Sequence, residues 1–302
     1  MLKPRALTPG DRIAVVSPAS PFARNEFDAG VAELGRLGFE PVFDDSVFAR
    51  DAYVSGPAEI RAQALLQAWR DPSIRALVAV RGGYGSVQLL PQLEREALRR
   101  TPKIFLGYSD NTSILTWLTC GCGIVGFHGP MLEGRLARGE SGFDRHSLEK
   151  SLCVAEPVGE LSPDGLTALK GGEASGPMFG GTVTQLVASL CTPFAFDPPP
   201  GCVLFLEDVN ERPYRIDRML TQLRLAGILS RASALVFGEM RGCDEPSGEV
   251  RVRNVVCELT KDFAGPVVYG FPSGHTTGPC WTLPLGVQTR VIADRHPRIV
   301  IE

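Results

Sequence analysis

The sequence lacks any apolar stretch that approaches the about 20 residues of a membrane-spanning helix. Its first residues lack the apolar core of a secretory signal peptide, and its lysines and arginines form no basic block of the kind that binds nucleic acid. The formal net charge over the 302 residues is only −3. We therefore expect a cytoplasmic protein whose partners include neither a membrane nor nucleic acid.

Residues that bind metal ions are also scarce. The chain has four histidines, and of its eight cysteines only Cys120 and Cys122 lie close together. One such pair, without a second Cys/His cluster, matches zinc spacing poorly. In a chain of this size without an export signal, we expect reduced thiols, many of them buried, and no metal or cofactor.

The chain is rich in alternating strand and helix patterns. Hydrophobic residues make up 44% and charged residues 22%, which is typical of a globular protein long enough for two domains. Apolar runs at 13–16, 41–43, 76–80 and 104–106 predict strands, and helical spacing predicts helices over 25–37, 59–69 and 87–98. This alternation predicts an α/β fold with a largely parallel sheet.

A polar segment divides the chain. We predict an N-terminal domain over residues 1–135, an irregular connector over 136–175, and a C-terminal domain over 176–302. The last of these shows strands at 202–206 and 234–237, helices at 215–226 and 252–261, and a β-rich end.

Three polar side chains each follow a predicted strand: Ser109, Glu207 and His275. The carboxyl ends of strands in α/β sheets are where sites are built. The order Ser–Glu–His is that of α/β-hydrolase triads, although order alone proves nothing. Glu207 directly follows its apolar run, whereas Asp208 should face the other way. His128 is a second candidate histidine, with a structural role favoured.

Ser109 lies at a predicted strand-to-helix turn. Gly107 supplies the small residue that a nucleophile elbow needs, and the N–H of Asp110 could stabilise an oxyanion. The same residues also make an ordinary helix N-cap, and Asn111 departs from the second glycine of the elbow pattern.

The glycine-rich loop Arg81-Gly82-Gly83-Tyr84-Gly85 opens after another strand. Its spacing matches neither a dinucleotide fingerprint nor a P-loop, which leaves an oxyanion-hole amide or a plain tight turn. Arg81 and Tyr84 are candidates to bind a substrate.

Taken together, these fragments resemble the LD-carboxypeptidases, the S66 serine peptidases that also include microcin C immunity-type peptidases. The resemblance rests on short motifs in a fixed order along nearly the whole chain: 81–85, 107–110, 128–131, 206–209, 213–220 and 270–275. It implies a Rossmann-like N-terminal domain, a C-terminal α/β domain rich in β, and an active site between them.

The resemblance also implies roles and a reaction. Ser109 is the nucleophile, Glu207 the orienting carboxylate and His275 the base, with an oxyanion hole at the amides of Gly83 and Asp110. Members of the family are commonly cytoplasmic homodimers that release D-alanine from murein tetrapeptides during peptidoglycan recycling.

The sequence departs from the family pattern at two positions. Thr182 stands where asparagine is expected, and Cys191 where glycine is expected. Neither is expected to touch the triad. Two other functions stay open: an immunity-type peptidase that cleaves peptidyl- or aminoacyl-nucleotide amides, and a non-catalytic ligand-binding relative.

Overall fold

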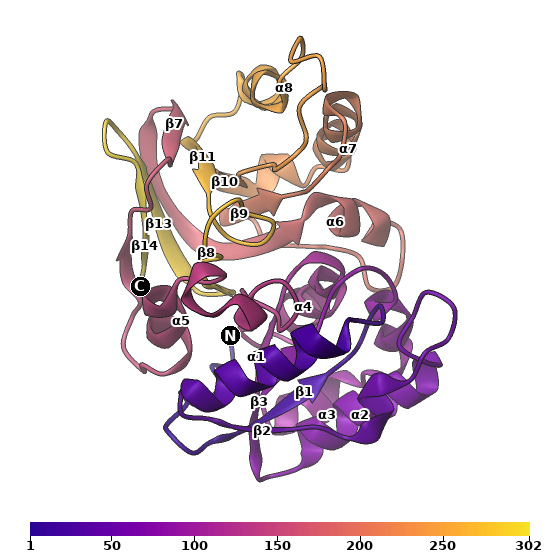
Figure 1. Ribbon diagram of the computed structural model, residues 1–302. Helices are drawn as coiled ribbons and strands as arrows, with labels where there is room; N and C mark the ends of the chain where they lie inside the picture. The colour runs from indigo at the N-terminus through magenta and orange to yellow at the C-terminus, as the bar shows by residue number, and fades with distance from the viewer. The chain divides into compact units, whose positions relative to one another are not determined.

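A computed structural model describes residues 1–302, and the chain divides into two compact units. The first unit contains residues 1–156 and 278–284, and the second contains 157–277 and 285–302. Both are mixtures of α-helices and β-strands (Figure 1). The predicted two-domain α/β fold is therefore confirmed.

The first unit is built on a six-stranded sheet with the order β12-β5-β4-β3-β1-β2. The first five strands pair in parallel: β1 with β2 and β3, β3 with β4, and β4 with β5. Their bounds are Arg12–Val16, Glu40–Val42, Ile74–Ala79, Ile104–Gly107 and Gly126–His128, with Leu283–Leu285 as β12. The strands β3 and β4 are almost wholly buried, which is why they appear in the sequence as continuous apolar runs.

Helices flank this sheet, as Figure 1 shows for α1 and α2. The long helices are α1 (Arg24–Arg36) and α2 (Ala58–Arg70), close to the predicted ranges. The helix predicted over 87–98 is instead a 3₁₀-helix, Ser86–Gln92, followed by the short α3, Arg95–Arg100. Pro91 accounts for the interruption, because proline has no N–H to donate within a helix.

The second unit contains an eight-stranded mixed sheet with the order β6-β14-β13-β8-β9-β10-β11-β7. Its centre is parallel, from β8 (Gly172–Thr182) through β9 (Cys202–Glu207) and β10 (Ala232–Gly238) to β11 (Val267–Phe271). The outer strands pair antiparallel: β13 (Gln288–Ala293), β14 (Arg298–Ile301), β6 (Gly159–Leu161) and β7 (Thr167–Lys170). The main helices are α6 (Val183–Ser189), α7 (Pro213–Leu225) and α8 (Val252–Thr260).

The segment 136–175, predicted to be irregular, is largely ordered into elements. It holds a 3₁₀-helix at Leu136–Ser141, helix α5 at Arg145–Leu152, the edge strands β6 and β7, and the start of β8. The side chain of Asp144 caps α5 by accepting the N–H of Ser147 at 2.6 Å. The prediction was wrong because these elements are short and half-exposed, so they lack long apolar runs.

No helix is long and apolar enough to cross a membrane. All eight cysteines are free, and four of them are buried: Cys122, Cys202, Cys243 and Cys280. No group of three or more His, Cys, Asp or Glu side chains is arranged to hold a metal ion.

Candidate active site

Ser109 sits on a strained turn at the carboxyl end of β4. Its φ is +62°, which is the left-handed region that side chains other than glycine seldom adopt. A 3₁₀ turn, Ser109–Asn111, and the helix α4, Thr112–Thr116, follow at once. Gly107 leaves little room there, because a Cβ would lie 3.2 Å from the Cβ of Asn111 and 3.3 Å from the Cβ of Ala79. Backbone strain of this kind at a strand-to-helix turn is typical of a nucleophile elbow.

Gly82 lies directly against the Ser109 side chain. A Cβ at this glycine would be 2.7 Å from both Cβ and Oγ of Ser109, and 3.2 Å from the backbone nitrogen of Asp110. The glycine loop and the serine turn therefore meet at the Ser109 side chain and the Asp110 backbone amide. The sequence indicated the glycine loop at 81–85, but it did not indicate that Gly82 would be the residue that contacts Ser109.

Ser20 holds the glycine loop in place. Its hydroxyl donates to the carbonyl of Tyr53 at 2.8 Å and accepts the N–H of Tyr84 at 3.1 Å. Gly83 has φ +98° and passes so close to Ser20 that a Cβ would meet its Oγ at 2.4 Å. A glycine is therefore required at position 83 on both conformational and steric grounds. Sequence reasoning missed Ser20, since its loop lies far from Gly83 along the chain.

Asp110 is buried and anchors the serine turn from behind. Its Oδ2 accepts the N–H of Ser86 at 2.8 Å, and its carbonyl accepts the Ser86 hydroxyl at 2.5 Å. Burial raises the pKa of Asp110, while these hydrogen bonds and the charge of Arg61 oppose that rise. Arg61 in turn donates to the carbonyl of Gly85 at 2.9 Å, so the turn and the loop share one network.

The two candidate substrate-binding residues differ in their surroundings. Arg81 forms an ion pair with Glu133 at 3.0 Å and donates to the carbonyl of Pro21 at 2.8 Å. Tyr84 is exposed and contacts the exposed Tyr53, with ring centroids 5.7 Å apart. Arg81 would have to share or exchange Glu133 to bind a substrate carboxylate, whereas Tyr84 is open to a ligand.

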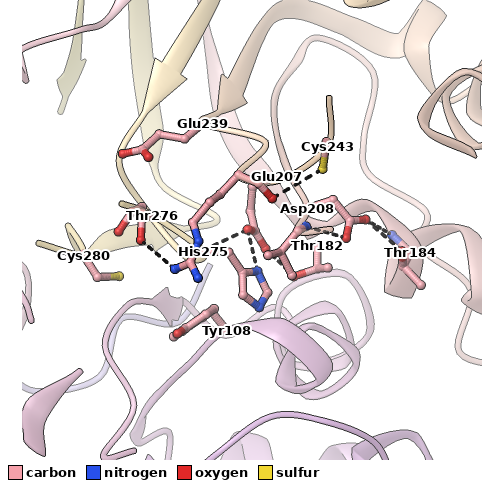
Figure 2. A network of polar contacts seen from close by, with 12 residues as sticks. Tyr108, Thr182, Thr184, Glu207, Asp208, Glu239, Cys243, His275, Thr276 and Cys280 are labelled. Carbon is pink, nitrogen blue, oxygen red and sulfur yellow. Dashed lines mark hydrogen bonds and ion pairs between the residues drawn. The ribbon is translucent and has the colours of Figure 1, made fainter. Parts of the chain in front are cut away.

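Glu207 and His275 come together in the second unit. Glu207 ends the buried strand β9 and is only 1% exposed. Its Oε2 lies 2.9 Å from Nδ1 of His275 and 3.1 Å from the backbone nitrogen of the same residue (Figure 2). Because the carboxylate can only accept, Nδ1 carries the proton of the neutral ring and Nε2 keeps its lone pair. This pairing orients a histidine as a general base.

Thr182 also binds Glu207, which corrects the expectation that this departure would not touch the proposed triad. The Thr182 hydroxyl donates to Oε1 of Glu207. The strands β8 and β9 pair in parallel with Thr182 opposite Glu207, so the contact follows from the register. Threonine, like the asparagine expected at this position, carries a hydrogen-bond donor. Cys191, the other departure, is exposed and has φ +63°.

Asp208 points away from His275, as the alternation along a strand predicts. Its Oδ2 accepts the N–H and the hydroxyl of Thr184 at 2.9 and 2.8 Å, at the start of α6 (Figure 2). Burial, reinforced by the charge of Glu207, raises the pKa of Asp208 to about 6. Asp208 therefore accepts hydrogen bonds at the start of α6 and does not orient the histidine.

His128 is buried within the sheet of the first unit. It ends β5, pairs with Gly107 of β4 and lies 5.9 Å from the ring of Tyr108. Its position on a paired strand, with 0% exposure, supports the structural role favoured from the sequence.

Comparisons with known proteins identify the class. Residues 13–129 match the LD-carboxypeptidase N-terminal domain, and residues 175–291 match the LD-carboxypeptidase C-terminal domain. The chain therefore belongs to the LD-carboxypeptidase family of S66 peptidases, as the sequence motifs predicted.

Individual relatives carry two kinds of name. The chain is 32% identical to the probable murein peptide carboxypeptidase of Bacillus subtilis (strain 168), over 95% of this chain and 90% of the relative. The structure of muramoyltetrapeptide carboxypeptidase from Oxalobacter formigenes is 28% identical, with a TM-score of 0.84 and coverage of 96% and 98%. The microcin C7 self immunity protein MccF in complex with aspartyl sulfamoyl adenosine is 27% identical, with a TM-score of 0.91 and coverage of 100% and 98%.

The contact between Gly82 and Ser109 gives a first prediction. Gly82→Ala should lower kcat about 100-fold, because a methyl group 2.7 Å from Oγ must displace the hydroxyl, and small misplacements of a reacting group are that costly. The backbone of Gly82 is outside the left-handed region, so the change is steric alone. Gly35→Ala is the matched control, since nothing lies within 4 Å of its Cβ. Similar kcat values for both variants would contradict the proposed position of the nucleophile.

Proposed function

We propose that this protein is a serine-type L,D-carboxypeptidase that releases the C-terminal D-alanine of a murein tetrapeptide. One observation carries the proposal: a buried Glu207 carboxylate lies on Nδ1 of His275, which leaves Nε2 as the unprotonated ring nitrogen, in a chain whose Ser109 occupies a strained turn. Membership of the LD-carboxypeptidase family and the relatives named for murein peptides support the substrate class.

In the proposed reaction, Ser109 Oγ attacks the carbonyl of the L-configured centre of the diamino acid. His275 Nε2 takes the serine proton and passes it to the amine of the leaving D-alanine. Water then cleaves the acyl ester by the same route. The amides of Gly83 and Asp110 are proposed to stabilise both tetrahedral oxyanions, and Glu207 the imidazolium. These residues carry out the whole sequence of proton and acyl transfers.

The second candidate function is cleavage of a peptidyl- or aminoacyl-nucleotide amide. The likeness to MccF bound to aspartyl sulfamoyl adenosine favours it, and the exposed rings of Tyr53 and Tyr84 offer a surface on which a base could stack. The relatives named for murein peptides support the first function equally directly, and it is the one we adopt.

A stereochemical comparison tests the proposed function. A tetrapeptide ending in D-alanine should be cleaved about tenfold to a hundredfold faster, in kcat/KM, than the same peptide ending in L-alanine. With the carbonyl and the terminal carboxylate both held, inversion of the last α-carbon releases one charge-assisted contact, which costs about 1.5–3 kcal/mol. Equal values for the two peptides, together with fast cleavage of a peptidyl-adenylate, would move the assignment to the nucleotide amide.

We also propose a cytoplasmic homodimer. The support is membership of the LD-carboxypeptidase family. Light scattering on the purified protein should give twice the 32.6 kDa mass of one chain, and a mass of one chain would contradict the dimer.

A further inference from the structure

We propose that Thr182 is a positioning residue that holds the Glu207 carboxylate so that it can fix His275. The inference rests on the proposed serine mechanism, but every contact in it lies within the second unit. Thr182 is assigned a positioning role, not a role on the reacting atoms. It acts through Glu207.

The two oxygens of Glu207 have different partners. Oε1 accepts the Thr182 hydroxyl, while Oε2 lies 2.9 Å from Nδ1 of His275 and 3.1 Å from its backbone nitrogen. The last torsion of a glutamate side chain is broad and has no sharp preference of its own. A donor on Oε1 therefore decides where Oε2 points, and so decides the orientation of the imidazole (Figure 2).

The backbone brings Thr182 into this position. Thr182 pairs with Glu207 in the register of β8 and β9. Two residues earlier, Gly180 has φ +139°, and a Cβ there would lie 1.8 Å from the carbonyl oxygen of Phe205. Only glycine permits the backbone at position 180 to lie this close to Phe205, so the end of β8 packs tightly against β9. On the other side of Glu207, a Cβ at Gly238 of β10 would lie 2.6 Å from the Glu207 Cβ. The end of β9 at Glu207 is thus packed closely against both neighbouring strands.

A neighbouring pair provides an internal control. Thr184, two residues after Thr182, donates to Asp208, one residue after Glu207. The two threonines therefore hold two adjacent carboxylates that face opposite ways. Removal of the Thr184 hydroxyl perturbs the same region without touching the oxygen atoms that face His275.

Other charged or titratable groups around Glu207 and His275 stay constant in this comparison. Glu239 accepts the N–H of Thr277 at 2.8 Å, and Arg241 donates to the carbonyl of Thr276 at 3.4 Å. Asp208, Glu211 and Cys243 also lie in this region, where Asp208 and Cys243 each interact with the charge of Glu207. A change in the titration of His275 after substitution of Thr182 alone therefore reports the Thr182–Glu207 contact.

The experiment compares Thr182→Val, Thr182→Ser and Thr184→Val with the unsubstituted protein. The imidazole C–H signals of the four histidines are followed by NMR against pH, and His275→Gln identifies the signal of interest. In Thr182→Val, Glu207 loses the donor that holds Oε2 against Nδ1, so the imidazolium loses part of its stabilisation and the apparent pKa of His275 should fall. Thr182→Ser and Thr184→Val should leave this pKa unchanged.

Kinetics on the murein tetrapeptide give the second readout. Thr182→Val should lower kcat/KM about tenfold, as expected for one hydrogen bond to a charged group, and its acid limb should move to lower pH. Thr182→Ser should recover most of the activity, and the KM should change little in either variant.

The outcomes separate the alternatives. An unchanged His275 titration in a folded Thr182→Val protein, or equal effects of valine and serine, would overturn the positioning role. A lowered pKa in Thr182→Val, reversed by serine, supports it even if no protein in the series cleaves the tetrapeptide. That last result would contradict the proposed function instead, because the titration needs no substrate.

Discussion

Replacement of Ser109 with glycine is expected to abolish hydrolysis while making the protein more stable. Loss of a serine nucleophile that works within a triad costs on the order of 10⁴–10⁶ in kcat. At φ +62°, glycine also relieves the left-handed strain that serine bears, which should stabilise the fold by about 1 kcal/mol after the entropic cost of glycine. Ser109→Ala should be as inactive without the gain in stability, because alanine keeps the strain.

Urea unfolding and tetrapeptide kinetics on the two variants check this prediction. Opposite movement of stability and activity in Ser109→Gly would show that the turn is strained for the benefit of the reaction. Near wild-type turnover by either variant would refute Ser109 as the nucleophile. A glycine variant less stable than the alanine variant would contradict the strain.

Glu207→Gln and His275→Ala are expected to be similarly crippling and to combine with little further loss. A base and its orienting carboxylate act as one unit, so their effects do not multiply. The contact of 2.9 Å between Oε2 and Nδ1 is the physical reason for the coupling within the second unit. Asp208→Asn is the matched control, because it removes the neighbouring charge but leaves one oxygen for Thr184.

Double mutants with Ser109→Ala extend the test to the proposed mechanism. If Ser109 and His275 share one proton transfer, Ser109→Ala with His275→Ala should lose no more activity than Ser109→Ala alone. Independent, multiplying losses would mean that the residues do not share a mechanism. A larger loss for Asp208→Asn than for Glu207→Gln would mean that the wrong carboxylate has been assigned.

Much of the fold could be predicted from the sequence because its central strands are buried on both faces. Strands β1, β4 and β9 and the part of β3 after Arg75 appear as apolar runs, and the helices between them show apolar residues at helical spacing. The edge strands β6 and β7 were missed, since half-exposed residues do not produce such a run. The helix after the glycine loop was predicted too long because Pro91 was not weighed against the apolar spacing.

The candidate site was predicted less completely. Ser109, Glu207 and His275 each follow an apolar run, so each could be predicted separately as a residue at the end of a strand. The contacts of Thr182 and Gly82 depend on strand register and on a meeting of distant loops, and neither leaves a local pattern in the sequence. Thr182 was noticed only as a departure from a family motif, and its role became apparent through its hydrogen bond to Glu207.

The release of D-alanine from murein tetrapeptide by the unsubstituted protein and by Ser109→Gly tests the central claim most directly. Chiral amino-acid analysis of the two digests, each with EDTA present, measures the product of the proposed reaction. We predict one D-alanine per tetrapeptide from the unsubstituted protein, and none above background from the folded glycine variant. D-alanine released at comparable rates by both proteins, or activity that EDTA abolishes and zinc restores, would contradict a serine L,D-carboxypeptidase.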